Sequence, residues 1–125
     1  NMGWCVGRSK PFSWIGWRGM NRQDCVREQR KQLVGLKPVD PRQWLPEGAQ
    51  LVLDPKQAIP MSMVGHVTSS YTCGSLGYSF AIGVVKGGLK RMGERVFAPL
   101  ADGRVIEAEI VSSVFFDPKG ERQNI

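Results

Sequence analysis

The sequence predicts a mostly all-β protein: a small antiparallel barrel of about six strands in a Greek-key-like order, behind a short helical lead. Three observations support this. Short runs of strand-forming residues fill the chain after residue 30. Turn signals rich in Gly, Pro and Asp separate these runs at regular intervals. One pair of runs is joined by Asp102-Gly103 and alternates apolar with charged residues. At 125 residues the chain is long enough for one domain with its own core.

The first 30 residues predict a lead segment with little regular structure. Gly3, Gly7 and Pro11 indicate a loop or broken strand over residues 1–12. Ser13 is a candidate N-cap for a helix that begins near Trp14. Residues 23–30 contain good helix formers, so we expect one or two short helical pieces here.

Six strands are expected after this lead. Residues 61–71 form the longest candidate, and residues 79–85 are almost continuously apolar, as in a strand covered on both faces. A period of two in the longest strand predicts one face with Met61, Met63, Gly65, Val67 and Ser69, and another with Val64, His66, Thr68 and Ser70. The expected strands are residues 32–36, 49–53, 61–71, 79–85, 96–100 and 103–111.

The last two strands form the clearest hairpin. Asp102-Gly103 predicts a type I′ turn, in which both central residues have positive φ. The alternation in the second strand predicts a buried face with Ile106, Ala108 and Ile110, and a solvated face with Glu107 and Glu109.

Composition excludes several classes of protein. No apolar run approaches the roughly 20 residues of a membrane span, so no membrane association is expected. Three widely spaced cysteines, Cys5, Cys25 and Cys73, argue against a disulfide framework and for a reduced, cytoplasmic setting. His66 is the single histidine and no CxxC pair is present, so no metal site is expected. The net charge of +6 is concentrated in residues 1–32, which hold seven Lys/Arg against two acidic residues.

The polar residues of the longest strand admit two interpretations. His66 is either a ligand or proton-transfer contact, or a barrel-wall histidine bonded to a backbone group. Thr68, Ser69 and Ser70 are either a nucleophile set or hydroxyls that satisfy backbone groups. The structural interpretation is favoured for both, because no GxSxG elbow or second catalytic group accompanies them.

Four segments carry a resemblance to a known family. In chain order they are residues 30–36 (RKQLVGL), 45–50 (LPEGAQ), 65–88 (GHVTSSYTCGSLGYSFAIGVVKGG) and 114–122 (VFFDPKGER). In this order they resemble the C-terminal barrel of the aminomethyltransferase family, which includes the glycine-cleavage T-protein. The similarity is closest to its sarcosine oxidase alpha-subunit branch and covers most of residues 3–123.

The chain departs from that family at two places. Cys73-Gly74 replaces the usual Ser-Pro turn, which predicts a looser loop. Ser13-Trp14 precedes Ile15-Gly16 where Asp-Phe is usual, and Trp17 replaces a basic residue. Tryptophans 4, 14 and 17 therefore predict apolar surface that a preceding domain covers.

The resemblance implies that residues 1–30 are a lead or tail of a preceding folate-binding domain and residues 31–125 the barrel. It implies oxidative demethylation of sarcosine to glycine, with one-carbon transfer to tetrahydrofolate, in a holoenzyme whose upstream domains and other sarcosine oxidase subunits are the partners. FAD, FMN and NAD are expected only in those other parts. The barrel would be a structural lid of the folate chamber without catalytic residues, inactive in isolation. Weak folate-side candidates are His66, Thr68, Ser69, Ser70, Tyr71, Phe115 and Phe116.

Two alternatives stay open. The basic lead, with Arg22, Arg27, Arg30 and Lys31, suggests a stand-alone nucleic-acid-binding barrel, although the nearly neutral barrel makes nucleic acid an unfavoured partner. Docking through the lead tryptophans would instead make the chain a protein-interaction module.

Overall fold

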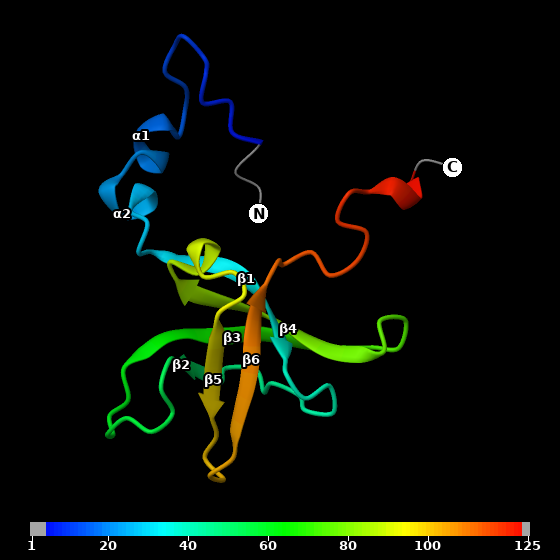
Figure 1. The fold of residues 1–125 in the computed structure, drawn as a ribbon. Coiled ribbons are helices and arrows are strands. Elements are labelled where there is room, and N and C mark those ends of the chain that lie inside the picture. Colours follow the sequence, from blue (N-terminus) through cyan, green and yellow to red (C-terminus); the bar gives the residue numbers. More distant parts are fainter. Residues whose placement is uncertain (1–4, 124–125) are drawn as a thin grey trace.

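A computed structural model describes residues 5–123, and its centre is a closed antiparallel barrel with strand order β1-β4-β3-β2-β5-β6 (Figure 1). Two four-residue helices precede it, so the expected mostly β architecture with a short helical lead is confirmed. The helices are α1 (Trp17–Met20) and α2 (Gln23–Val26). The strands are β1 (Lys31–Pro38), β2 (Gln50–Val52), β3 (Met63–Cys73), β4 (Tyr78–Lys86), β5 (Arg95–Pro99) and β6 (Val105–Val111). Two 3₁₀ turns, η2 (Gly88–Lys90) and η3 (Glu121–Gln123), complete the elements.

Strand β1 gives the barrel its Greek-key order. Strands β2, β3 and β4 follow one another as antiparallel neighbours, and β1 lies beside β4 instead of β2. The other edge of β1 pairs with β6, from Gly35 opposite Val111 to Pro38 opposite Ala108. This second pairing, together with the contact of β2 and β5 at Val52 opposite Phe97, closes the barrel.

The core lies inside the barrel and follows the alternation of the strands. In β6 the buried residues are Ile106, Ala108 and Ile110, as the sequence predicted. The core cluster comprises Val34, Leu36, Leu45, Leu51, Val67, Ala81, Val85, Val96, Ala98, Ile106, Ala108 and Ile110. None of them comes from the lead, so the barrel forms its hydrophobic core from its own strands and connections.

The β1–β2 connection contributes the buried Leu45 to this core. Two inward-facing serines hold the connection. Ser79 Oγ donates to the Gln43 carbonyl over 2.6 Å, and Ser70 Oγ donates to the Leu45 carbonyl. We call residues 43–47 the plug, because they join the barrel interior through one apolar side chain and two backbone carbonyls. The serine hydroxyls therefore satisfy carbonyl groups that would otherwise lose their hydrogen bonds to water on burial.

A β-bulge in β3 corrects the face assignment made from strict alternation. Val67 pairs with Gly83 and Ser69 with Ile82, so Thr68 is the extra residue. Beyond the bulge the faces exchange: Ser70 points inward and Ser69 shares the outer face with His66. The Thr68 hydroxyl donates to the Ile82 carbonyl over 2.8 Å. The bulge therefore explains both why Ser70 can bind the plug and why period two failed after Val67.

Two local predictions were wrong. Helix α1 begins at Trp17 with Gly16 as its N-cap, not near Trp14 with Ser13 as its N-cap. Gly16 adopts the left-handed conformation (φ 93°), which redirects the chain there.

The β5–β6 turn is not type I′. Among residues 5–123 the only non-glycine residue with positive φ is Asp117, so Asp102 lacks the required conformation. Gly103 N–H donates to the Leu100 carbonyl, and Gly103 alone is left-handed (φ 85°). These features are typical of a three-residue loop ending in a glycine bulge.

Candidate functional site

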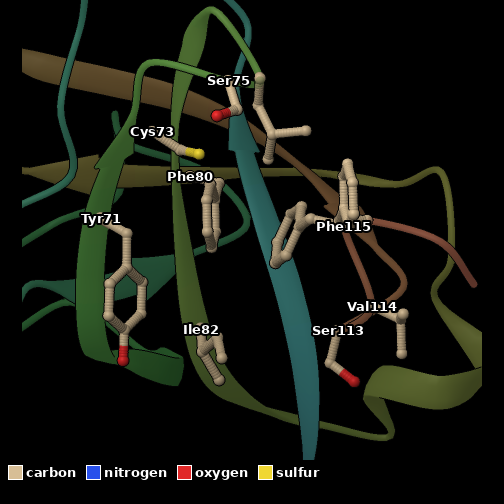
Figure 2. Close-up of a pocket in the computed structure, with 10 residues that line it drawn as sticks. Tyr71, Cys73, Ser75, Phe80, Ile82, Ser113, Val114 and Phe115 are labelled. Atoms are coloured by element: carbon tan, nitrogen blue, oxygen red, sulfur yellow. The ribbon is translucent and has the colours of Figure 1, made fainter. Parts of the chain in front are cut away.

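The candidate site is an apolar groove of about 590 Å³ on the outer wall of the barrel (Figure 2). Strand β3, strand β4 and the segment after β6 form its sides. Its lining is Tyr71, Cys73, Ser75, Leu76, Phe80, Ile82, Ser113, Val114, Phe115 and Phe116. Charged side chains are absent from this lining, so the described part of the groove offers an apolar surface with a few hydroxyl groups and one thiol.

Three aromatic rings lie in a row across the groove. Figure 2 shows the Phe80 ring between those of Tyr71 and Phe115. The ring centroids of Tyr71 and Phe80 are 5.3 Å apart with stacked planes, and those of Phe80 and Phe115 are 4.1 Å apart. Contacts at these separations stabilise aromatic pairs and hold the rings in place. Tyr71 and Phe116 are nevertheless about half exposed, at 46% and 52%.

Glycine 35 allows the C-terminal segment to form one side of this groove. A Cβ atom at this position would lie 2.3 Å from the Ser112 carbonyl oxygen and 2.7 Å from Phe115 Cζ. Any side chain would therefore displace the segment. Because Gly35 is in β1 and faces outward, its missing side chain leaves the space that the Phe115 ring fills beside Phe80.

The structure brings together three of the seven sequence-predicted residues. Tyr71, Phe115 and Phe116 line the groove, whereas His66, Thr68, Ser69 and Ser70 do not. The Thr68 and Ser70 hydroxyls bind backbone carbonyls, as the structural interpretation predicted. His66 lies on the outer face opposite Gln50 and Val84. Its ring makes no hydrogen bond with residues 5–123, so the expected bond to a backbone group is not found there.

Sequence reasoning missed the centre of the groove. Phe80 and Ile82 lie on the outer face of β4, and Leu76 and Val114 extend the apolar lining. The continuous apolar run at residues 79–85 was the available signal. It predicted a strand covered on both faces, and the outer side is only partly covered by Phe115.

The perturbed titratable groups lie outside the groove. A hydrogen bond from Arg42 holds the pKa of Asp40 below its usual value, and the same pair raises the pKa of Arg42. Arg104 lowers the pKa of Asp102 in the same way, and the Arg104 pKa rises. Both ion pairs are exposed to solvent, and each joins two residues of the same loop. No group of three metal-ligating side chains occurs within residues 5–123.

The lead segment keeps its large apolar residues near the surface. Trp14 and Trp17 contact each other edge to face with centroids 5.8 Å apart, and both are half-buried. Trp4 lies outside the described residues. Ile15 and Phe12 are exposed. Among the basic lead residues, Arg27 pairs with Asp24 at 3.4 Å and Arg30 donates to the Cys25 carbonyl.

The closed barrel and its outer groove define a C-terminal barrel domain of the aminomethyltransferase type. Residues 31–117 match the family model described as the glycine cleavage T-protein C-terminal barrel domain, and the chain belongs to this family. A solved structure, glycine cleavage system aminomethyltransferase T from Bartonella henselae, is similar with a TM-score of 0.53 and 31% identity. That similarity covers 66% of this chain and 21% of the other.

Three curated relatives of the chain are sarcosine oxidase alpha subunits. The chain is 38% identical over 125 residues to sarcosine oxidase subunit alpha of Corynebacterium sp. (strain U-96), and 39% identical over 127 residues to that of strain P-1. The subunit alpha of Rhizobium meliloti (strain 1021) is 32% identical over 121 residues. These matches cover 98%, 98% and 96% of this chain, but only 13%, 13% and 12% of the relatives. None of the helices within residues 5–123 has the length and apolar character of a membrane span.

Proposed function

We propose that this chain serves as the C-terminal barrel of a sarcosine oxidase alpha subunit and forms one wall of its folate chamber. The observation that carries this proposal is the match of nearly the whole chain to three such subunits. In this assignment residues 1–30 are the tail of the preceding folate-binding domain and residues 31–125 are the barrel. Upstream domains and other oxidase subunits are its partners in the cytoplasm.

The family resemblance supplies the reaction. Sarcosine is oxidatively demethylated to glycine, and the one-carbon unit passes to tetrahydrofolate. FAD or FMN and NAD belong to other domains or subunits. The barrel contributes no nucleophile, acid or base, so its role is to bound the chamber and to exclude water from it.

The groove fits only part of tetrahydrofolate. The Tyr71, Phe115 and Phe116 rings line the groove and offer apolar contact to a planar ring, while Phe80 packs between Tyr71 and Phe115 and holds them in place. The lining carries no charged side chain for the polar edge or carboxylates of the ligand. We therefore assign contact with the ring system to Tyr71, Phe115 and Phe116, and polar recognition to the upstream domains.

Two assays on the assembled oxidase test this assignment: formation of the one-carbon adduct of tetrahydrofolate, which gives the KM for tetrahydrofolate, and oxygen uptake. Tyr71→Ala and Phe116→Ala are expected to raise the KM for tetrahydrofolate several-fold and to leave sarcosine-dependent oxygen uptake without folate unchanged. Val105→Ala, at a similarly exposed position on the β5–β6 hairpin, is the matched control. An unchanged KM for tetrahydrofolate in both groove variants would contradict the proposed contact between the groove and the folate ring system. Sarcosine turnover by the 125-residue chain alone would overturn the whole proposal.

A further inference from the structure

A second cleft, of about 610 Å³, lies between the lead segment and the barrel. It is separate from the aromatic groove and shares no lining residue with it. The lead and β1 supply most of one side, and the turn after β4 supplies the other. Its lining is Arg8, Met20, Cys25, Val26, Arg27, Glu28, Arg30, Gln32, Leu33, Leu89 and Lys90.

Positive charge dominates this cleft. Four basic side chains face one acidic side chain, Glu28, which pairs with Lys90 at 2.6 Å. Arg27 pairs with Asp24 just outside the lining. Arg30 uses one N–H on the Cys25 carbonyl, and the Arg8 side chain makes no ion pair or hydrogen bond with residues 5–123. Arg8 and Arg30 therefore keep guanidinium donors available for a carboxylate.

Aliphatic side chains lie among these charges. Met20 and Val26 come from the lead, and Leu33 and Leu89 from the barrel. Val26, Leu33 and Leu89 are each about half exposed. The described lining contains no aromatic ring, so it lacks the stacking surfaces on which single-stranded nucleic acids bind.

The turn after β4 is attached to both the lead and β1. Gly87 N–H donates to the Arg30 carbonyl of the lead over 3.0 Å, and Leu89 N–H donates to Gln32 Oε1 of β1 over 2.9 Å. Gly88 permits this approach, because a Cβ there would lie 2.7 Å from Val34 Cγ1. The η2 turn therefore presents Leu89 and Lys90 to the lead in a fixed position.

We propose that this cleft is a docking site for an acidic amphipathic segment of a partner protein. Aliphatic side chains of the segment contact Val26, Leu33 and Leu89. Its carboxylates bind Arg8 and Arg30. This charge complementarity, on a surface with an apolar component and no stacking platform, selects a peptide over nucleic acid. The assignment is independent of the role proposed for the aromatic groove.

Fluorescence polarisation with the 125-residue chain tests the proposal. The probe is a labelled 14-residue amphipathic helix with leucines on one face and glutamates on the other. We expect saturable binding that weakens with added salt, and at least a tenfold loss with Arg8→Glu plus Arg30→Glu. Lys56→Glu plus Lys119→Glu makes the same change in net charge away from the cleft and should preserve binding. Near-UV circular dichroism checks that each variant keeps its fold.

Two further variants separate the contributions without disturbing the lead. Arg8→Gln removes only an exposed charge, and Leu33→Ser removes only an aliphatic contact. Each variant should weaken binding of the probe several-fold. A probe with lysines in place of the glutamates should not bind. Equal losses in the control double variant would overturn the site. Tighter binding of a single-stranded oligonucleotide of equal charge, or self-association of the chain in sedimentation runs, would assign the cleft to another occupant.

Discussion

The barrel and the lead differ in how deeply they bury their apolar side chains. Leu36 in β1 is fully buried inside the barrel, whereas Ile15 in the lead is fully exposed. Every residue of the core cluster lies after residue 33, and neither α1 nor α2 contains a buried residue. The barrel therefore has the burial needed for independent stability, whereas the lead adds no side chain to the core and is attached to the barrel by polar contacts such as the Glu28–Lys90 ion pair.

Truncation of matched aliphatic residues should show this difference most strongly. Leu36→Ala removes three buried carbons and should lower the free energy of unfolding by about 2–5 kcal/mol. Ile15→Ala should change it by less than about 0.5 kcal/mol, because no contact is lost from the core. Urea unfolding followed by circular dichroism measures both. A comparable loss at Ile15 would mean that the lead is part of the cooperative barrel.

Adding a methyl group at Gly35 should disturb the groove while the barrel beneath it stays intact. Gly35→Ala forces Ser112 and Phe115 away, at a cost of about 1–3 kcal/mol. Gly74→Ala, which meets nothing within 4 Å, is the control. Amide exchange should accelerate in residues 112–116 of the Gly35 variant while β1 stays protected. Unchanged exchange there would contradict the role given to Gly35.

The attachment of the plug should contribute less. Ser79→Ala leaves the Gln43 carbonyl without its donor and should cost about 1–2 kcal/mol. Ser75→Ala, at an exposed loop position, should cost almost nothing. Thermal unfolding of the two variants compares them directly. Equal melting temperatures would show that the Ser79 hydrogen bond adds nothing to the attachment that Leu45 and Ser70 already provide.

The smallest effect is expected at the tip of the β5–β6 hairpin. Arg104 lowers the pKa of Asp102, so the folded state favours the charged carboxylate. The contribution is present above the usual carboxyl pKa of about 3.9 and is lost as the pH falls through the lowered value. Arg104→Gln should raise the Asp102 pKa towards normal in an NMR titration. Because both side chains are exposed, unfolding at neutral pH should hardly change.

The sequence predicted the fold correctly where apolar and polar residues alternate regularly along a strand. In β6 the apolar and charged residues alternate without interruption, and their faces were assigned correctly. In β3 the bulge at Thr68 exchanged the faces, and no residue type there signals a bulge. The Asp102-Gly103 turn shows the same limit, because two residues fit more than one loop length.

The candidate site was less predictable for a spatial reason. Tyr71, Phe115 and Phe116 were identified through resemblance, but Phe80 was assigned to a strand covered on both faces. Its contact with Phe115 depends on Gly35, which is distant from both in sequence. Such a three-way contact arises from the β1–β4 pairing and cannot be derived from local pattern.

The pairing of β1 also has a consequence for the order of folding. Residues 31–38 find their strand partners only in β4 and β6, the nearer of which ends at Lys86. During synthesis β1 therefore emerges long before either partner, and non-local pairing of this kind slows folding. The lead, attached directly before β1, gains its bonds to Gly87 and Lys90 only after the same delay.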